Sequence, residues 1–216
     1  NGVTINGDLS ITGSSVFNAD YDSSGTGTFT LAATKALTAL TISISANDVD
    51  ILGATSSGTG STTVAVSDGG TIGLGGTTGD MTISGAELGN ITAGTLNIGN
   101  SSTGNITVDG ISAANSNNMT TVNLTTGSAS SVSFSNNDST FNALTASGGS
   151  STSFGSGLTV TTDTGKLALN PVSLTSAGAL TLAGATGIDF GSGVTFTAGG
   201  DLTMSTTSGD IIGTGA

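Results

Sequence analysis

Carboxylates are the side chains of this 216-residue chain that could do chemistry, because it has 14 Asp and Glu, two Lys and no His or Cys. Two carboxylates suffice for glycoside hydrolysis. Three spacings could supply such a pair: Asp20 with Asp22, Asp48 with Asp50, and Asp189 with Asp210. A polysaccharide lyase would also need a cation beside its uronate and a base to accept the proton. The isolated Lys35 and Lys166 do not form that set.

The same carboxylates have a simpler interpretation as solubilising groups. They lie in the middle of short apolar blocks or in the segments between them, where we expect side chains to face water. We therefore predict that the protein is not an enzyme, and we assign no catalytic, cofactor-binding or metal-ligating residue and no cofactor. Calcium stays an open alternative without named ligands. Asp-x-Asp spacing suits a hard cation, but Gly75–Asp80 is only distantly similar to the nonapeptide of calcium-binding β-rolls.

Composition narrows the class of partner and of fold. A net charge of −12 excludes nucleic acid, which needs Lys or Arg to displace phosphate counterions, and disfavours anionic membrane surfaces. No run approaches the ~18 apolar residues that would span a bilayer, so we expect no membrane insertion. The 36 Gly oppose helix, whereas the many aliphatic residues, Thr and Ser favour strands. The composition therefore predicts an ordered all-β protein.

Short apolar–polar–apolar triplets recur at steps of 20 to 22 residues in the last part of the chain, in three interleaved series. The first series is Leu158–Val160, Leu180–Leu182 and Leu202–Met204; the second is Leu167–Leu169, Ile188–Phe190 and Asp210–Ile212; the third is Val132–Phe134, Thr152–Phe154, Val172–Leu174 and Val194–Phe196. Because side chains alternate along a strand, the outer two residues of each triplet should point inward. The third series then predicts one interior column of Phe134, Phe154, Leu174 and Phe196, and the second makes Asp189 and Asp210 near neighbours in adjacent coils.

Three strands per period are typical of a parallel β-helix, or β-solenoid, with three short strands per coil. The chain length predicts about ten coils and one domain over residues 1–216. At ~4.8 Å per coil, the rod would be roughly 50 Å long. Its least regular part, residues 114–119, is predicted to be a widened corner or a small loop.

The two ends of the chain carry the same strand pattern, at Asn1–Ile5 and Asp210–Ala216, without a polar cap or a covering helix. An open solenoid end presents unpaired backbone groups to another chain. We therefore expect a segment of a longer chain or a filament subunit. The expected partners are like subunits or neighbouring repeats that meet these open ends, with surface glycans as a further alternative.

Several phrases of the sequence resemble the repeats of filamentous-haemagglutinin-type exoproteins of the two-partner secretion pathway. They are Thr181–Gly184, Thr197–Thr203, Leu88–Ile98 and Gly104–Val108. The resemblance is one of repeat style and extends over most of the chain. It implies a right-handed parallel β-helix, export to the cell surface, and a role in adhesion or matrix building. The secretion domain of that family is not evident in this sequence.

The resulting functional hypothesis is a non-catalytic structural rod of a secreted, extracellular or cell-surface protein, either an adhesin-like stalk or a fibre-forming subunit. Two alternatives remain open: a carbohydrate- or ice-binding β-helix, and a polysaccharide-degrading β-helix enzyme. Ice-binding solenoids present ranks of Thr, and Thr159, Thr181 and Thr203 would form such an outward ladder. Glycosylation is also unresolved, with Asn-x-Ser/Thr sequons at Asn90, Asn100, Asn105, Asn118, Asn123 and Asn137.

Overall fold

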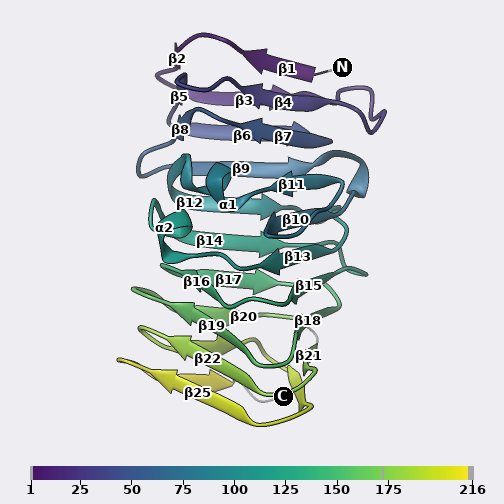
Figure 1. Ribbon diagram of the computed structural model, residues 1–216, viewed down its shortest axis with the longest axis vertical. Helices are drawn as coiled ribbons and strands as arrows, with labels where there is room; N and C mark the ends of the chain where they lie inside the picture. Colours follow the sequence, from purple (N-terminus) through teal and green to yellow (C-terminus); the bar gives the residue numbers. More distant parts are fainter. Residues whose placement is uncertain (1, 172, 214–216) are drawn as a thin grey trace.

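The computed structural model describes residues 2–171 and 173–213. It is a parallel β-solenoid of about 10 turns, whose coils stack along one axis (Figure 1). The fold class predicted from the repeat is confirmed, with three sheets and three strands per coil. In the regular coils each coil adds one strand to each face, so even a strand of three residues is paired above and below.

The first face of the rod consists of two sheets. The early coils contribute β1 (Gly2–Ile5), β4 (Thr28–Leu31) and β7 (Asp48–Ile51). The later coils contribute, in spatial order, β11 (Met81–Ile83), β10 (Ile72–Gly75), β13 (Ile106–Asp109), β15 (Ser131–Phe134), β18 (Ser151–Phe154), β21 (Ser173–Ser176) and β24 (Thr195–Ala198). The face is therefore interrupted between β7 and β11.

The second face also has an early and a late part. The early strands are β2 (Leu9–Ser10), β5 (Ala36–Thr38) and β8 (Ala54–Ser56), and the late strands are β16 (Ser139–Phe141), β19 (Leu158–Thr162), β22 (Leu180–Gly184) and β25 (Leu202–Thr206). Two one-turn helices lie between these parts, α1 (Gly85–Gly89) before β12 (Ile91–Gly99) and α2 (Ala113–Ser116) before β14 (Met119–Thr125). Each occupies the position in its coil that β16 occupies before β17 (Leu144–Ser147). The segment 114–119, predicted to be a loop or widened corner, is thus partly helical. The reason is local: the Ser112 hydroxyl accepts a hydrogen bond from the Asn115 N–H at 3.3 Å and caps α2.

The third face runs the length of the rod. Its strands are β3 (Ser14–Asn18), β6 (Thr41–Ala46), β9 (Ser61–Val66), β12 (Ile91–Gly99), β14 (Met119–Thr125), β17 (Leu144–Ser147), β20 (Leu167–Leu169), β23 (Ile188–Phe190) and β26 (Ile211–Gly213). The first residues of β12 pair with β8 and its later residues with β9, so this long strand joins the second face to the third. A 3-10 turn, η1 (Ser67–Gly69), follows β9.

The core is a column of apolar side chains inside the coils. Burial alternates along the strands as predicted, for example through all six residues of β6. The buried apolar residues form one cluster that extends from Ala19 in the first coil to Ile188 near the other end. Phe134 and Phe154 stack within it, with ring centroids 5.2 Å apart and planes 12° from parallel.

The predicted column of Phe134, Phe154, Leu174 and Phe196 is wrong in its second half. Phe154 lies opposite Ser176, whereas Leu174 and Phe196 continue the column of Val132 and Thr152. The coil from β18 to β21 is 22 residues long, two more than the preceding one. A shift of two residues preserves the inward and outward faces, so the apolar pattern alone could not detect it.

The register of the last coil also differs from the predicted triplet series, although Asp210 does lie in the adjacent coil near the start of β23. Asp189 lies opposite Ile212, because the corner before β26 is one residue longer than the sequence spacing implied. The Asp210 carbonyl instead accepts a hydrogen bond from the Ile188 N–H at 3.1 Å, which places its backbone beside the start of β23.

Candidate functional site at the interrupted face

The most distinctive polar site of the described residues lies where β7 and β11 face each other without a backbone ladder. The cause is an extra strand. After β10 the chain returns through residues 76–80, so that β11 pairs in parallel with β10, with Ile72 opposite Met81. This return is tight: a Cβ at Gly73 would lie 2.5 Å from the Thr78 carbonyl carbon. The far edge of β11 is then left facing β7 (Figure 1).

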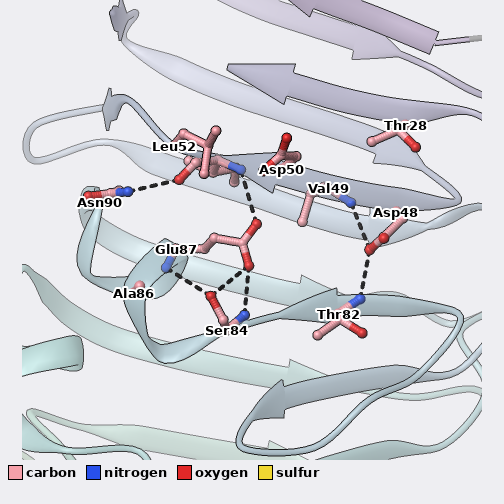
Figure 2. Close-up of a pocket in the computed structure, with 11 residues that line it drawn as sticks. Thr28, Asp48, Val49, Asp50, Leu52, Thr82, Ser84, Ala86, Glu87 and Asn90 are labelled. Carbon is pink, nitrogen blue, oxygen red and sulfur yellow. Dashed lines mark hydrogen bonds between the residues drawn. The ribbon is translucent and has the colours of Figure 1, made fainter. Parts of the chain in front are cut away.

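The Asp48 carboxylate bridges this gap at the start of β7. Asp48 Oδ1 accepts hydrogen bonds from the Val49 N–H at 2.9 Å and from the Thr82 N–H at 2.8 Å (Figure 2). In a continuous sheet these two N–H groups would donate to backbone carbonyls of neighbouring strands. The Asp48 side chain therefore takes the place of a carbonyl acceptor and ties β7 to β11.

The Glu87 carboxylate bridges the gap at the end of β7. Glu87 Oε1 accepts from the Ile51 N–H at 3.0 Å, and Oε2 accepts from the Ser84 N–H at 2.9 Å and the Ser84 hydroxyl at 2.8 Å. The Ser84 hydroxyl in turn accepts from the Glu87 N–H at 3.2 Å, which completes a capping box on α1. Asn90 Nδ2 donates to the Ile51 carbonyl at 2.8 Å (Figure 2). The single turn of α1 thus positions Glu87 and Asn90, the two side chains that bridge the gap at this end.

A cavity of about 610 Å³ opens between these bridges. Its lining combines the carboxylates of Asp48, Asp50 and Glu87 with the Thr28 hydroxyl and the side chain of Leu52, which is 52% exposed. The structure thus places the predicted pair Asp48 and Asp50 in one cavity and adds Glu87. Asp48 accepts hydrogen bonds from the backbone of both strands, and Glu87 accepts them from β7 and from Ser84, the residue after β11. We therefore interpret them as replacements for the missing ladder.

Sequence reasoning missed Glu87, although a signal for it exists. Ser84-Gly-Ala-Glu87 has the spacing of a capping box, in which a Ser at the N-cap is followed three residues later by Glu. The motif predicts the helix and one bond of the carboxylate. It does not predict that the other oxygen reaches a strand 36 positions earlier in the chain.

The other two carboxylate pairs differ in their surroundings. Asp20 is 2% exposed and accepts hydrogen bonds within its own loop and from Ser67, whereas Asp22 lies on the exposed part of the same loop. Asp189 Oδ2 lies 3.8 Å from Lys166 Nζ, a surface ion pair of small energetic weight. Among the described residues, no three His, Cys, Asp or Glu side chains gather closely enough to hold a metal ion.

Outward hydroxyl groups form regular columns on the faces of the rod. The predicted ladder of Thr159, Thr181 and Thr203 is confirmed by the pairing register. A longer column on the first face contains Thr82, Gly73, Thr107, Ser133, Ser153, Thr175 and Thr197. Neighbouring side chains in such columns bond to each other: the Ser133 and Ser153 hydroxyl oxygens lie 2.9 Å apart, and Asn123 Nδ2 donates to Asn97 Oδ1 at 2.9 Å.

The sequon residues also take part in bonds between coils. Asn118 is exposed, as expected for the irregular corner, and its Nδ2 donates to the Gly89 carbonyl at 2.9 Å. Asn137 Nδ2 donates to the buried Asp109 carboxylate at 2.9 Å. These contacts give several sequon side chains a structural role, and glycosylation stays an open question.

Comparison with known proteins adds no family assignment, since no family model, curated protein or solved structure matches the chain. Within the described part of the chain, no helix is long and apolar enough to cross a membrane. The β-solenoid is consistent with a β-helical repeat segment, which is the coarser part of the resemblance noted in the sequence.

Proposed function

We propose that this chain is a structural rod of a secreted protein that acts at the cell surface or in the extracellular matrix, as a stalk or as a fibre-forming subunit, without catalysis. The observation that supports this function is the uniformity of the molecule along its axis. Parallel ladders link successive strands on each face, apart from the gap between β7 and β11 on the first face and the helical turns α1 and α2 on the second, and one apolar core extends through the coils. Stability that accumulates coil by coil suits a rod, whose function depends on length and stiffness.

The polar surface of the rod supports the same function. The outward columns consist mainly of Ser, Thr, Asn and Asp, and a net charge of −12 opposes side-by-side association of such rods. The family resemblance at Thr197–Thr203 and Leu88–Ile98 is what suggests export and the extracellular location. We extend it to an adhesin-like or matrix-building role on that basis.

The proposed partners are like subunits or neighbouring repeats that stack on the two end coils. At one end Met204 is 37% exposed, although its register partner Leu182 in the preceding coil is fully buried. At the other end Val3 and Ile5 are partly buried, whereas their partners Phe29 and Leu31 are fully buried. Because all strands are parallel, one end can continue the sheets only by meeting the opposite end of another coil.

Two measurements test this function. Immunogold labelling of intact source cells with antibodies against the chain should mark the cell surface or the surrounding matrix, and labelling confined to the cell interior would contradict the proposal. Negative-stain electron microscopy of the purified chain should show smooth rods. If copies stack, rod lengths should be multiples of roughly 50 Å, the span of about ten coils, and Met204→Glu should leave only the shortest rods.

Ice binding is the second candidate, and the hydroxyl columns favour it. Beside the Thr159, Thr181 and Thr203 column lies a second column of Thr140, Thr161, Ala183 and Ser205 on the same face. Such a face has regular spacing in two directions, which an ordered water lattice could match. Thermal hysteresis of the purified chain decides the matter: ice binding requires a measurable gap between melting and freezing, and replacing Thr181 with Lys should abolish it.

A further inference from the structure

The loop of residues 19–27, between β3 and β4, extends beyond the stacked coils (Figure 1). It carries an exposed aromatic side chain. Tyr21 is the only Tyr of the chain and is 86% exposed. Among the described aromatic residues it alone is exposed, since the Phe side chains are buried or partly buried in the core. The exposed ring presents an apolar face to solvent, on which a ligand can stack.

Hydrogen bonds to the Asp20 side chain hold the loop that carries Tyr21. Asp20 Oδ1 accepts from the Ser24 N–H and the Ser24 hydroxyl, both at 3.0 Å, and Oδ2 accepts from the Gly25 N–H at 3.1 Å. The Ser67 hydroxyl, on η1 beyond β9, donates to Oδ2 at 2.6 Å and fastens the loop to a later coil. The backbone on either side of Tyr21 is therefore held in place before any ligand arrives, which lowers the entropy cost of ordering the loop on binding.

The base of the loop is equally constrained. A Cβ at Gly27 would lie 2.0 Å from the Ala19 carbonyl oxygen, so the two ends of the loop approach as closely as only glycine permits. Gly25 has a φ of 69° and Ser23 a φ of 53°, both in the left-handed region. A loop shaped by these features is built to hold one conformation.

A cavity of about 260 Å³ lies beside the ring, lined by Gly2, Asn18, Ala19, Tyr21 and Asp22. The side chains among these residues include the amide of Asn18, the carboxylate of Asp22 and the aromatic ring of Tyr21. Asn18 Oδ1 accepts from the Asp20 N–H at 3.2 Å, which fixes the amide and leaves its NH₂ group as the donor toward a ligand. A ring, a hydrogen-bond donor and a strong acceptor in one shallow site match a pyranose, which has an apolar C–H face and adjacent hydroxyl groups.

We propose that this loop binds a single neutral pyranose residue of a glycan, with the C–H face of the sugar on Tyr21 and its hydroxyl groups on Asn18 and Asp22. This inference rests on the proposed surface function, for which it supplies an adhesive site. The charge of the protein selects among sugars. Asp22 and a net charge of −12 repel sialic acid, uronic acids and sulfated sugars, so the ligand is a neutral hexose or N-acetylhexosamine.

Tyrosine fluorescence gives a direct test, because the chain has one Tyr and no Trp. The probes are the methyl glycosides of glucose, galactose, mannose and N-acetylglucosamine, with N-acetylneuraminic acid as the charged comparison. We expect at least one neutral glycoside to change the Tyr21 emission saturably in the millimolar range, and the charged sugar to leave it unchanged. Saturation-transfer NMR with the same sugars measures binding in variants that lack the fluorophore.

The variants separate the ring from the fold. Tyr21→Ala should weaken binding by at least about tenfold, whereas Tyr21→Phe should retain most of it because the ring remains. Leu40→Ala removes another exposed apolar side chain, 64% exposed, and should leave binding unchanged. The proposal is overturned if no neutral glycoside binds, or if Tyr21→Ala binds as tightly as the parent. Because immunogold labelling and rod lengths do not depend on Tyr21, failure of the sugar site is distinguishable from failure of the rod function.

Discussion

The regular coils at the C-terminal end and the junction between the third and fourth coils provide acceptors for backbone N–H groups in different ways. Between β18, β21 and β24, each strand pairs with the next at four positions, and β19, β22 and β25 pair at five. Between β7 and β11 there is no ladder among the described residues, and the carboxylates of Asp48 and Glu87 serve as acceptors. In the regular coils the acceptors of the ladder are backbone carbonyls, whereas at the junction carboxylates accept from the Thr82 and Ile51 N–H groups.

The difference lies in what each arrangement requires of the sequence. A backbone ladder tolerates almost any outward side chain, because its donors and acceptors belong to the main chain. The junction requires two particular carboxylates, and the remaining ladders there are short: β8 pairs with β12 at two positions and β9 with β12 at four. One inserted strand thus makes the rod depend, at this junction, on the identity of two side chains, whereas the regular coils do not depend on their outward side chains.

The largest effect is expected inside the regular region, where only the core is sensitive to sequence. Phe154→Asp places a charge in an apolar column at a position that is 3% exposed. It should cost more than the about 3–5 kcal/mol typical of Phe→Ala, and coils near β18 should lose amide protection in hydrogen exchange. Ser153→Asp, one residue away on the outward side, is the matched control. Full protection in the Phe154 variant would mean that this register is wrong.

Glu87→Ala breaks the junction itself. It leaves the Ile51 and Ser84 N–H groups without their acceptor, and an unsatisfied, partly buried donor costs about 1–3 kcal/mol. Residue-resolved hydrogen exchange should accelerate at Ile51, Ser84 and their neighbours, while amides in β21 and β22 keep their rates. Glu87→Gln retains a carbonyl acceptor and should lose much less. Uniform acceleration along the rod would contradict a local role for this bridge.

These two regions also differ in how far the sequence predicts them. The period of the triplets gave the solenoid, the three strands per coil and the inward face of most residues, because burial alternation is a local property. It could not set the register of Leu174 over Thr152 rather than Phe154, since both choices bury the same face. The bridge by Glu87 could not be predicted either, because it depends on the extra strand β11 and on contact between two successive coils.

Thr152 offers a finer test of the regular region, since it is a buried hydroxyl in an otherwise apolar column. Its Oγ1 has no hydrogen-bond partner among the described residues. Thr152→Val keeps the shape and removes the unsatisfied group, so it should raise the free energy of unfolding by about 1 kcal/mol. The control is Thr162→Val, which should lower the free energy of unfolding because the Thr162 hydroxyl donates to the Gly165 carbonyl at 2.8 Å. Equal effects of the two substitutions in denaturant unfolding would refute this distinction.

The smallest effect concerns a third arrangement, in which a carboxylate organises a loop rather than a gap. Hydrogen bonds, foremost from the Ser67 hydroxyl, lower the pKa of Asp20 from its usual 3.8 to about 2. A lowered pKa means that the charged form is favoured by folding, so its contribution is complete above pH 3.8 and is lost as the pH falls through about 2. Below that range the Ser24 and Gly25 amides should exchange faster and Tyr21 fluorescence should change, while amides in β21 keep their protection. Asp20→Asn should remove this acid transition, whereas a transition that persists in Asp20→Asn would assign it to another carboxylate.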